Sequence, residues 1–385
     1  MAESILFVGK RPEAIQAARR LGFTVLLLSE KGPRRADPVD DFRLAVFDGS
    51  DPTPAARELA HGHAVRAVLA GTERGVEAAA WVREALGLPG LSRTVAACFS
   101  DKAAMRAAAH RAGIPCATFV SGASRPNRET LLAAIGLPMV IKDRRGSGGR
   151  NMIIARTPDE VPESLPAHRL AESFVSGVEL SVESTVVRGE PVFTNCTEYV
   201  IPRWCNVLPH SMPLAQEAEV LAFNRRVLQG LGLERGFAHL ELFLTADGIR
   251  FGEVAARPPG GRIMELIGLA YGRDPWGDWI RDECGDPVDP PTPATRFAGM
   301  RVFHPGPGVV KSLRGVRAAR EVPGVVRVSN FLRKGKAVGP RLGVSQEGGH
   351  IVATDSDPEA LKSTLEKAYS CIRITLEEAP DPPAA

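Results

Sequence analysis

The sequence predicts a protein of the α/β and α+β classes, with a parallel α/β domain at the N-terminus and a small α+β domain at the C-terminus. Three observations predict this. Apolar runs alternate with helical patterns over residues 1–92, which is typical of a parallel sheet covered by helices. Residues 295–376 alternate strands with glycine turns and close on one helix. The 385 residues exceed what one hydrophobic core organises, so a further domain is expected over residues 93–294.

The N-terminal domain is predicted from its alternating elements. The strands are expected at residues 5–8, 24–28, 44–47 and 64–69, and the helices from Pro12, from Asp51-Pro52 and over 75–86. Such a strand–turn–helix unit also binds dinucleotides, but Gly9-Lys10-Arg11-Pro12 lacks the second and third glycines of that fingerprint. We therefore interpret the turn as structural and expect no dehydrogenase. A cluster of breakers at residues 88–91 ends the domain.

The central part is predicted from the same periodicities. Helices are expected from Ser100 or Asp101 to Gly113 and over residues 129–135 and 215–231. Strands are expected over residues 138–142, over 170–187 with a break at 176–177, and in a hairpin over 239–245 and 249–255.

The last helix has the clearest start signal in the chain. Ser356 and Glu359 have the spacing of a capping box, and Pro358 suits the first turn. Residues 377–385 are expected to form a flexible tail.

Composition excludes several classes of protein. Lys and Arg number 48 against 45 Asp and Glu, and the charges are interleaved, so no nucleic-acid partner is expected. No apolar run approaches the roughly 18 residues of a membrane span, and the N-terminus lacks a secretory signal, so a cytoplasmic location is expected. The six cysteines form no Cys-x-x-Cys pair and the eight histidines no His-x-x-x-His pattern, which argues against zinc and for reduced thiols.

The predicted hairpin carries the most informative pair of residues. A three-residue loop, 246–248, places Glu241 opposite Glu253. Carboxylates about 5 Å apart at Cβ repel one another, so a cation is expected between them. Paired hard oxygen ligands suit Mg²⁺ carrying nucleotide phosphates, with Mn²⁺ as the other metal to consider. The alternative is a solvated strand face with two ordinary acids. Arg257 would add a fixed cation beyond the same strand.

Two lysines are candidates for phosphate binding. Lys142 ends an apolar strand and precedes Gly146-Ser147-Gly148-Gly149, a loop whose backbone N–H groups can surround an anion and whose small residues allow it to close as a lid. Because the lysine precedes the glycines, this is not a P-loop. Lys102 lies in the first turn of a predicted helix, where a cation is mildly unfavourable unless it meets a phosphate. Solvated surface lysines are the alternative for both.

The order of these motifs along nearly the whole chain resembles the ATP-grasp superfamily. Glu172-Ser173-Phe174-Val175-Ser176-Gly177-Val178-Glu179 is similar to its interdomain hinge. The resemblance implies that the backbone of Phe174 and Val175 holds adenine, with Glu172 at its amino group and Glu179 on the ribose. It also implies a lid subdomain at about 115–175, a catalytic subdomain at about 176–294, and the roles already suggested for the two lysines and the two glutamates.

Within the superfamily, the chain resembles the branch of L-amino acid ligases and carnosine-synthase-like enzymes. The similar features are the segment 253–261, the small C-terminal domain, and His210 with Pro213 ahead of a helix. The resemblance implies catalytic roles for Arg257, Lys142 and His210. Ala255 departs from the pattern, because many members have a metal-binding Asn there, so the number of bound metal ions stays open.

These features predict an ATP-dependent carboxylate–amine ligase that works through an acyl phosphate. The expected partners are small-molecule carboxylates and amines, chiefly amino acids, and a second copy of the chain in a homodimer. The alternatives are other ATP-grasp chemistry, such as bicarbonate carboxylation or ligation onto a purine or sugar intermediate, and a nucleotide-binding regulator without turnover. Arg262 is open between a clamp for a second substrate carboxylate and a surface charge.

Overall fold

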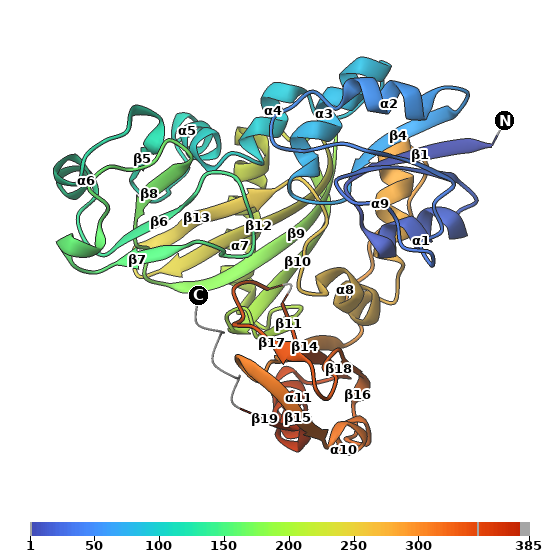
Figure 1. The fold of residues 1–385 in the computed structure, drawn as a ribbon, viewed down its shortest axis with the longest axis vertical. Helices are drawn as coiled ribbons and strands as arrows, with labels where there is room; N and C mark the ends of the chain where they lie inside the picture. The colour runs from blue at the N-terminus through green and yellow to red at the C-terminus, as the bar shows by residue number, and fades with distance from the viewer. Residues whose placement is uncertain (1, 345, 378–385) are drawn as a thin grey trace, which may run out of the picture.

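The N-terminal domain is a parallel sheet in the order β3-β2-β1-β4, in a computed structural model that describes residues 2–344 and 346–377 (Figure 1). Its elements are β1 (Glu3–Val8), α1 (Pro12–Arg20), β2 (Thr24–Ser29), β3 (Asp41–Leu44), α2 (Thr53–Ala60), β4 (Ala64–Ala70) and α3 (Gly75–Leu86). Side chains of β1 alternate between two apolar clusters, with Phe7 in one and Leu6 in the other, so helices can cover both faces. The predicted parallel α/β class is confirmed, although the third strand lies earlier than predicted.

A small antiparallel sheet follows, in the order β5-β8-β6-β7. Its elements are β5 (Phe119–Ser121), α6 (Arg128–Ile135), β6 (Met139–Asp143), β7 (Ile153–Ala155) and β8 (Arg169–Ser173). It has an apolar cluster of its own, in which Leu131 of α6 packs with Met139 and Ala171. This sheet is therefore a separately packed unit, and the chain leaves it at Ser173, next to the predicted break at 176–177.

The largest sheet has eight strands in the order β13-β12-β9-β10-β11-β14-β18-β16. They are β9 (Val178–Val187), β10 (Glu190–Ile201), β11 (Cys205–Leu208), β12 (Arg235–Thr245), β13 (Gly248–Ala255), β14 (Phe297–Phe303), β16 (Val325–Asn330) and β18 (Gly349–Asp355). β11 and β14 pair across the predicted boundary at 294–295, with Asn206 opposite Met300. Backbone hydrogen bonds thus join the central and C-terminal parts into one sheet.

Helices cover the eight-stranded sheet on both faces. They are α5 (Lys102–Arg111), α7 (Leu214–Gly230), α8 (Ile263–Tyr271) and α9 (Pro275–Cys284), while α4 (Arg93–Cys98) packs between α3 and α5. Val220 of α7 shares an apolar cluster with Leu180, whereas Met264 of α8 shares another with Leu208. Because Leu208 and Leu180 leave opposite faces of the sheet, α7 and α8 lie on opposite sides of it. Within the described residues, no helix has both the length and the apolar character that crossing a membrane requires.

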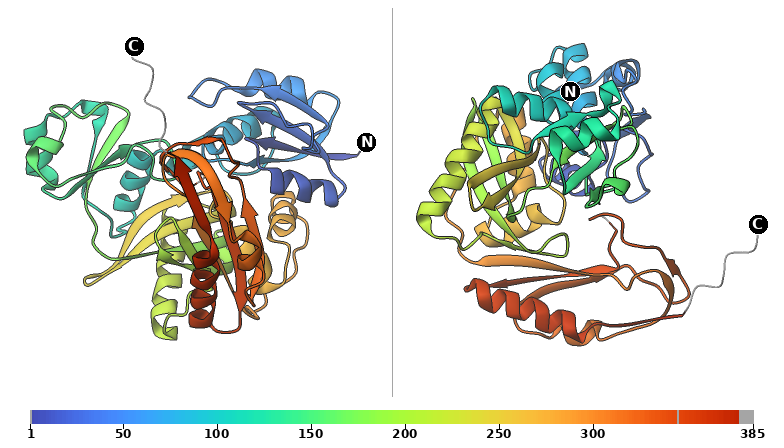
Figure 2. Two further views of the ribbon diagram at one scale, coloured as in Figure 1. Left: turned by 60° about the horizontal axis from the view of Figure 1, so that its bottom comes forward. Right: turned by 90° about the vertical axis from the view of Figure 1, so that its left-hand side faces the viewer.

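The C-terminal domain extends the central sheet and adds a second layer (Figure 2). Its other elements are β15 (Gly308–Arg314), α10 (Val316–Arg320), β17 (Ala337–Val338), α11 (Pro358–Cys371) and β19 (Arg373–Glu377). Leu361 and Leu365 of α11 pack in one cluster with Val207 and Ile351, which makes α11 the cover for this end of the sheet. The predicted α+β class is confirmed here. Of the predicted tail, residues 378–385 lie outside the described part of the chain.

The β12–β13 hairpin differs from the predicted one in its turn. Thr245 pairs with Gly248, so the loop is one residue shorter than predicted. The register shifts just after Glu241, where Gly252 is the extra residue of a β-bulge. The bulge compensates for the shorter loop and returns Glu241 to the position opposite Glu253.

The predicted capping box of α11 is wrong by one position. Asp357 is the N-cap, and its carboxylate accepts a hydrogen bond of 2.8 Å from the backbone N–H of Ala360. Pro358 does begin the helix, so the residue directly before it takes the capping position from Ser356. A carboxylate at this position also meets the positive end of the helix dipole.

We expect Asp357→Ala to lower the free energy of unfolding by about 1 kcal/mol, because a backbone N–H of the first turn loses its acceptor. Thermal or urea unfolding followed by circular dichroism measures the change. Ser356→Ala is the matched control and should stay within about 0.5 kcal/mol of the parent chain. Equal losses in both variants would contradict the assignment of Asp357 as the cap.

Candidate active site

Two glutamates face each other across the β12–β13 ladder. Glu241 and Glu253 are register partners, so their side chains leave the same face of the sheet. The cross-strand rows of β9, β10 and β12 bring further polar side chains to that face: Glu179, Ser181, Glu183, Asn195, Thr197 and His239. The predicted pairing of the two carboxylates is confirmed, and a polar strip surrounds it.

A buried carboxylate binds several of the polar side chains on this face of the sheet. Glu183 has no exposed surface, and it accepts hydrogen bonds of 2.7 Å from the side chains of Ser181, Asn195 and Thr197. Its Oε1 lies 3.0 Å from Nδ1 of His239, and Nε2 of the same ring lies 3.5 Å from Oε1 of Glu241. Burial alone would lower the pKa of His239, but its bonds to the two carboxylates raise it to about 9. His239 is therefore charged at neutral pH and ties Glu241 to the buried network.

Burial and neighbouring charges shift the pKa values of the carboxylates on this face of the sheet. Burial acts to raise the pKa of Glu241, but the hydrogen bond and charge of His239, followed by the charges of Lys142 and Lys102, hold it below its usual value. Burial and the charge of Glu241 raise the pKa of Glu179 to about 7, although Arg203 and His239 act in the opposite direction. A divalent cation would relieve this crowding of carboxylates, because it favours their charged forms.

The donor set fits a metal that also carries phosphate. No three His, Cys, Asp or Glu side chains of residues 2–344 and 346–377 form a complete metal site by themselves. Glu241 and Glu253 offer hard oxygen ligands only, which suits Mg²⁺ completed by water and phosphate oxygens.

Lys102 connects this carboxylate pair to the glycine-rich loop. It is the first residue of α5, where the Asp101 side chain caps the helix by accepting from the N–H of Ala103. Its Nζ lies 3.1 Å from Oε1 of Glu253 and donates a 2.7 Å hydrogen bond to the carbonyl of Gly146. Burial would lower the pKa of this lysine, but the charges of Glu253 and Glu73 outweigh it and raise the pKa. Lys102 thus carries a firmly held positive charge at the pair.

Lys142 belongs to a second buried ion cluster. Its Nζ contacts Oε1 of Glu172, and Arg106 binds the other oxygen of Glu172 through Nε at 3.0 Å and Nη2 at 2.9 Å. Burial would raise the pKa of Glu172, but Arg106 and Lys142 lower it to about 2. The carboxylate predicted to meet the adenine amino group is therefore already held by two cations.

The glycine-rich loop lies against two distant parts of the chain. Gly146, Gly148 and Gly149 have φ values of 140°, 74° and 68°, which residues with a side chain rarely adopt. A Cβ on Gly148 would come within 3.3 Å of Val344, and one on Gly149 within 3.3 Å of Arg203. The loop, with Ser147 inside it, therefore lies against the C-terminal domain and the β10–β11 turn.

The predicted adenine hinge joins the small sheet to the large one. Phe174 and Val175 follow β8, and the backbone N–H of Phe174 donates a 3.1 Å hydrogen bond to the carbonyl of Pro138. Phe174 is 41% exposed. Glu179 comes shortly afterwards, in the second position of β9. The structure thus places this segment at the junction of the two sheets, on the chain path between Lys142 and Glu241.

Arg257 forms an ion pair with a glutamate of the N-terminal domain. Its Nε and Nη2 lie 2.7 Å and 2.6 Å from Oε2 of Glu73, and its Nη1 donates to the carbonyl of Pro258 at 2.8 Å. Glu73 belongs to the loop between β4 and α3. Burial raises the pKa of Glu73 above its usual value, although the charges of Arg257 and Lys102 act in the opposite direction.

The structure does not bring His210 to the other predicted site residues. Its charged neighbours are Glu198, Glu217 and Lys362, on β10, α7 and α11. Glu198 is in register with Leu180, whose face is covered by α7 and lies opposite the face of Glu241. Burial lowers the pKa of His210, which favours its neutral form. The ring therefore belongs to the far side of the sheet.

Arg262 lies among carboxylates without a close partner in the described residues. Its guanidinium is 3.9 Å from Glu13, 3.9 Å from Glu265 and 3.8 Å from Glu347. It stands in the left-handed conformation at the N-cap of α8, with φ of 60°.

Sequence reasoning missed Glu73, Arg106 and His239. Arg106 lies one turn after Lys102 on α5, so helical spacing from a predicted site lysine is a signal for it. Glu73 follows a buried parallel strand, and ligand sites form at the carboxyl ends of such strands. His239 precedes Glu241 by two positions, which puts both on one face of β12.

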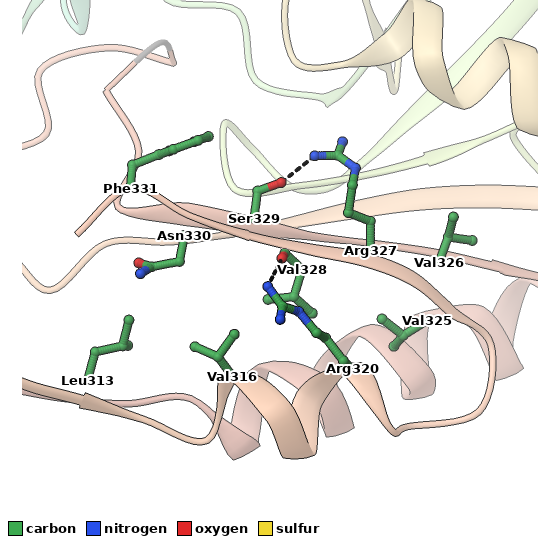
Figure 3. Close-up of a pocket in the computed structure, with 10 residues that line it drawn as sticks. All are labelled: Leu313, Val316, Arg320, Val325, Val326, Arg327, Val328, Ser329, Asn330 and Phe331. Carbon is green, nitrogen blue, oxygen red and sulfur yellow. Dashed lines mark hydrogen bonds between the residues drawn. The ribbon is translucent and has the colours of Figure 1, made fainter. Parts of the chain in front are cut away.

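A separate groove lies in the C-terminal domain between α10 and β16 (Figure 3). Val316, Val325 and Val328 give it an apolar lining, and Arg320 donates to the carbonyl of Val328. Arg327 points away from α10, where it bonds to Ser329 and to Glu265 of α8. β16 and β13 form opposite edges of the eight-stranded sheet, so the groove is remote from the carboxylate pair.

The chain matches three families of protein domains. Residues 15–90 match the ATP-grasp N-terminal domain, residues 107–261 the ATP-grasp domain, and residues 301–377 the L-amino acid ligase C-terminal domain 2.

Its relatives include proteins of different activity. The chain is 27% identical to the uncharacterized protein y4rH of Sinorhizobium fredii over 71% of its length, and spans 60% of that protein. It is 22% identical to the L-arginine-specific L-amino acid ligase of Bacillus subtilis over 70% of each chain. It is 24% identical to the formate-dependent phosphoribosylglycinamide formyltransferase of Burkholderia thailandensis, over 94% of this chain and 92% of the enzyme.

Solved structures share the fold. The L-amino acid ligase of Bacillus licheniformis has a TM-score of 0.84 at 17% identity, covering 98% of this chain and 99% of the ligase. The N5-carboxyaminoimidazole synthase of Aspergillus clavatus, solved with ADP and 5-aminoimidazole ribonucleotide, has a TM-score of 0.74 at 17% identity, covering 96% and 98%. The chain thus contains an ATP-grasp domain, preceded by an ATP-grasp N-terminal domain and followed by the C-terminal domain 2 of the L-amino acid ligases.

Proposed function

We propose that this protein is an ATP-dependent ligase that joins a carboxylate to an amine, with amino acids as substrates, and releases ADP and phosphate. The observation that carries the proposal is the carboxylate pair of Glu241 and Glu253, flanked by Lys102 and Arg257 in a chain with an L-amino acid ligase C-terminal domain. The L-arginine-specific ligase of Bacillus subtilis supports the substrate class.

The reaction needs activation because oxygen is a poor leaving group from a carboxylate at neutral pH. The γ-phosphoryl group of ATP passes to the substrate carboxylate, and the resulting acyl phosphate loses phosphate when the amine attacks. The site must exclude water, since water would hydrolyse the acyl phosphate. The glycine-rich loop, which lies against the C-terminal domain at Val344, suits that task.

Each part of the site has a proposed role. Glu241 and Glu253 would hold Mg²⁺ or Mn²⁺, which when bound stabilises the charge of the transferred phosphoryl group. Lys102, Lys142 and the loop Ser147-Gly148-Gly149 neutralise the phosphates. Arg257 helps Lys142 to neutralise the transferred phosphoryl group, and it then stabilises the oxyanion that forms when the amine attacks. A fourth set would bind the nucleoside: Glu172, Phe174, Val175 and Glu179.

The proposal extends to the organisation of the chain. Residues 1–92, 93–294 and 295–376 are the proposed domains, with the lid at about 115–175. The eight-stranded sheet ties the second of these to the third, so motion of the lid relative to the large sheet is the proposed route for substrate entry. A cytoplasmic location and a homodimer remain part of the proposal.

Hydroxylamine tests the acyl phosphate directly. The parent chain should form a hydroxamate that depends on ATP and on a carboxylate substrate, and Glu253→Gln should reduce it by roughly 100-fold, because a metal ligand contributes several kcal/mol to charge stabilisation. Asp247→Asn makes the same chemical change at the exposed turn of the same hairpin and should leave the yield unaltered. An unchanged yield with Glu253→Gln would remove the metal role.

A second candidate is the chemistry of the relatives that act on ribonucleotides, which the match to the Burkholderia enzyme over 94% of this chain favours. ADP release measured over pairs of amino acids, and separately with bicarbonate plus 5-aminoimidazole ribonucleotide or with formate plus phosphoribosylglycinamide, distinguishes the two. We expect stimulation by amino-acid pairs and none by bicarbonate or formate. The reverse result would select the second candidate, and nucleotide binding without any ADP release would indicate a regulator.

A further inference from the structure

The N-terminal domain holds the segment after β13 at two points. Arg11, at the turn after β1, donates a hydrogen bond from Nη2 to the carbonyl of Pro259. Glu73, in the loop after β4, binds Arg257. Both loops lie at the carboxyl ends of neighbouring parallel strands, so one edge of the N-terminal sheet contacts this segment.

Close packing fixes the loop that carries Glu73. A Cβ on Gly71 would lie 2.1 Å from the carbonyl oxygen of Gly9, and one on Gly75 would lie 2.3 Å from that of Val8. The N–H of Gly71 also donates a 2.8 Å hydrogen bond to the carbonyl of Val8. The glycines on both sides of Glu73 therefore allow its loop to pack closely against the end of β1. This close packing limits the positions that the carboxylate of Glu73 can adopt.

The contact with Arg257 restricts the guanidinium in orientation as well as position. Nε and Nη2 converge on one oxygen of Glu73, and Nη1 binds the carbonyl of Pro258 on the other side. The side chains of Glu73 and Arg257 are only 9% and 13% exposed, so water screens the pair weakly. All three nitrogens are thus held, while Nη1 and Nη2 each retain one further N–H for a ligand.

We propose that Glu73 is a positioning residue: it holds Arg257 in the orientation in which the guanidinium stabilises the charge of the reacting groups. The proposal rests on the function proposed above for Arg257. It makes the N-terminal domain part of the catalytic apparatus, since a side chain of that domain sets the geometry of the cation after β13.

A double-mutant cycle tests this coupling. Glu73→Gln keeps the shape and one acceptor oxygen and should lower kcat about 10-fold, whereas Glu73→Ala should lower it about 100-fold. The KM for ATP should change less than about threefold, because Arg257 acts on charge that develops during the reaction. In a chain that already contains Arg257→Ala, replacing Glu73 should have no further effect.

A matched control distinguishes the positioning of Arg257 from a general loss of contact between the N-terminal domain and the rest of the chain. Arg20→Ala removes the exposed ion pair of Arg20 with Asp274, 3.0 Å long, which joins α1 of the N-terminal domain to the start of α9. This variant should retain the parent kcat, and circular dichroism should show every variant to be folded at the temperature of the assay. Independent, additive losses from Glu73 and Arg257 would overturn the proposal, as would an unchanged kcat in Glu73→Ala.

A second readout needs no acceptor substrate. Binding of ADP with aluminium fluoride, which imitates a phosphoryl group in transfer, can be measured by calorimetry in the same four chains. Affinity should fall in Glu73→Ala and in Arg257→Ala, with no further loss in the double variant. If the parent chain forms no hydroxamate with any carboxylate, the proposed ligase function fails, while this cycle still decides whether Glu73 acts through Arg257.

Discussion

The structure depends on one electrostatic constraint: two carboxylates are held opposite each other on adjacent strands of a largely buried sheet. Glu241 and Glu253 cannot move apart, because the backbone hydrogen bonds of β12 and β13 fix their spacing. Their repulsion has to be balanced by positive charge from elsewhere in the chain. Lys102 supplies it to Glu253, and His239, itself anchored by the buried Glu183, supplies it to Glu241. A phosphate-bearing metal complex is the ligand that such an arrangement favours most.

The balancing cations come from separate units of the fold. Lys102 and Arg106 lie on one helix, Lys142 on the small sheet, and Arg257 after the last strand of the hairpin. Each of these cations contacts a carboxylate from another element of the chain. Lys102 binds a glutamate of β13, Arg106 and Lys142 share one of β8, and Arg257 binds one of the N-terminal domain. The paired charges therefore do more than bind a ligand, because they also connect the N-terminal domain, the small sheet and the large sheet at one place. Isolated surface ion pairs contribute little to stability, but these pairs are mostly buried, where a lost partner is costly.

Local patterns predicted the elements of the fold well, and they predicted long-range contacts poorly. Pro12, Pro358 and the apolar runs mark helix starts and strands because their effects act within a few residues. The pairing of Glu241 with Glu253 was predicted correctly although the turn was not, since the bulge at Gly252 offsets the shorter loop. The cap of α11 was misplaced because Ser356 and Asp357 are both good caps by sequence, and only the position of the helix start distinguishes them. The contact of Glu73 with Arg257 and the placement of His210 could not be predicted, because both depend on how distant segments pack. His210 fits a family pattern in sequence, but it lies on the far face of the sheet, where the charges of Glu198 and Lys362 act on it.

The continuity of the eight-stranded sheet has a consequence for any attempt to shorten this protein. β11 has β10 on one side and β14 on the other, and β14 lies beyond residue 294. A fragment ending there would leave the backbone N–H and C=O groups of Cys205–Leu208 unpaired at an exposed strand edge. It would also expose the side chains of Cys205 and Val207, which pack in one apolar cluster with α11. Such an edge recruits strands from other copies, so the fragment would aggregate before it could be studied as an isolated catalytic module. Excision after β13 meets the same obstacle, which makes the small sheet, with its own core, the better unit for transplantation.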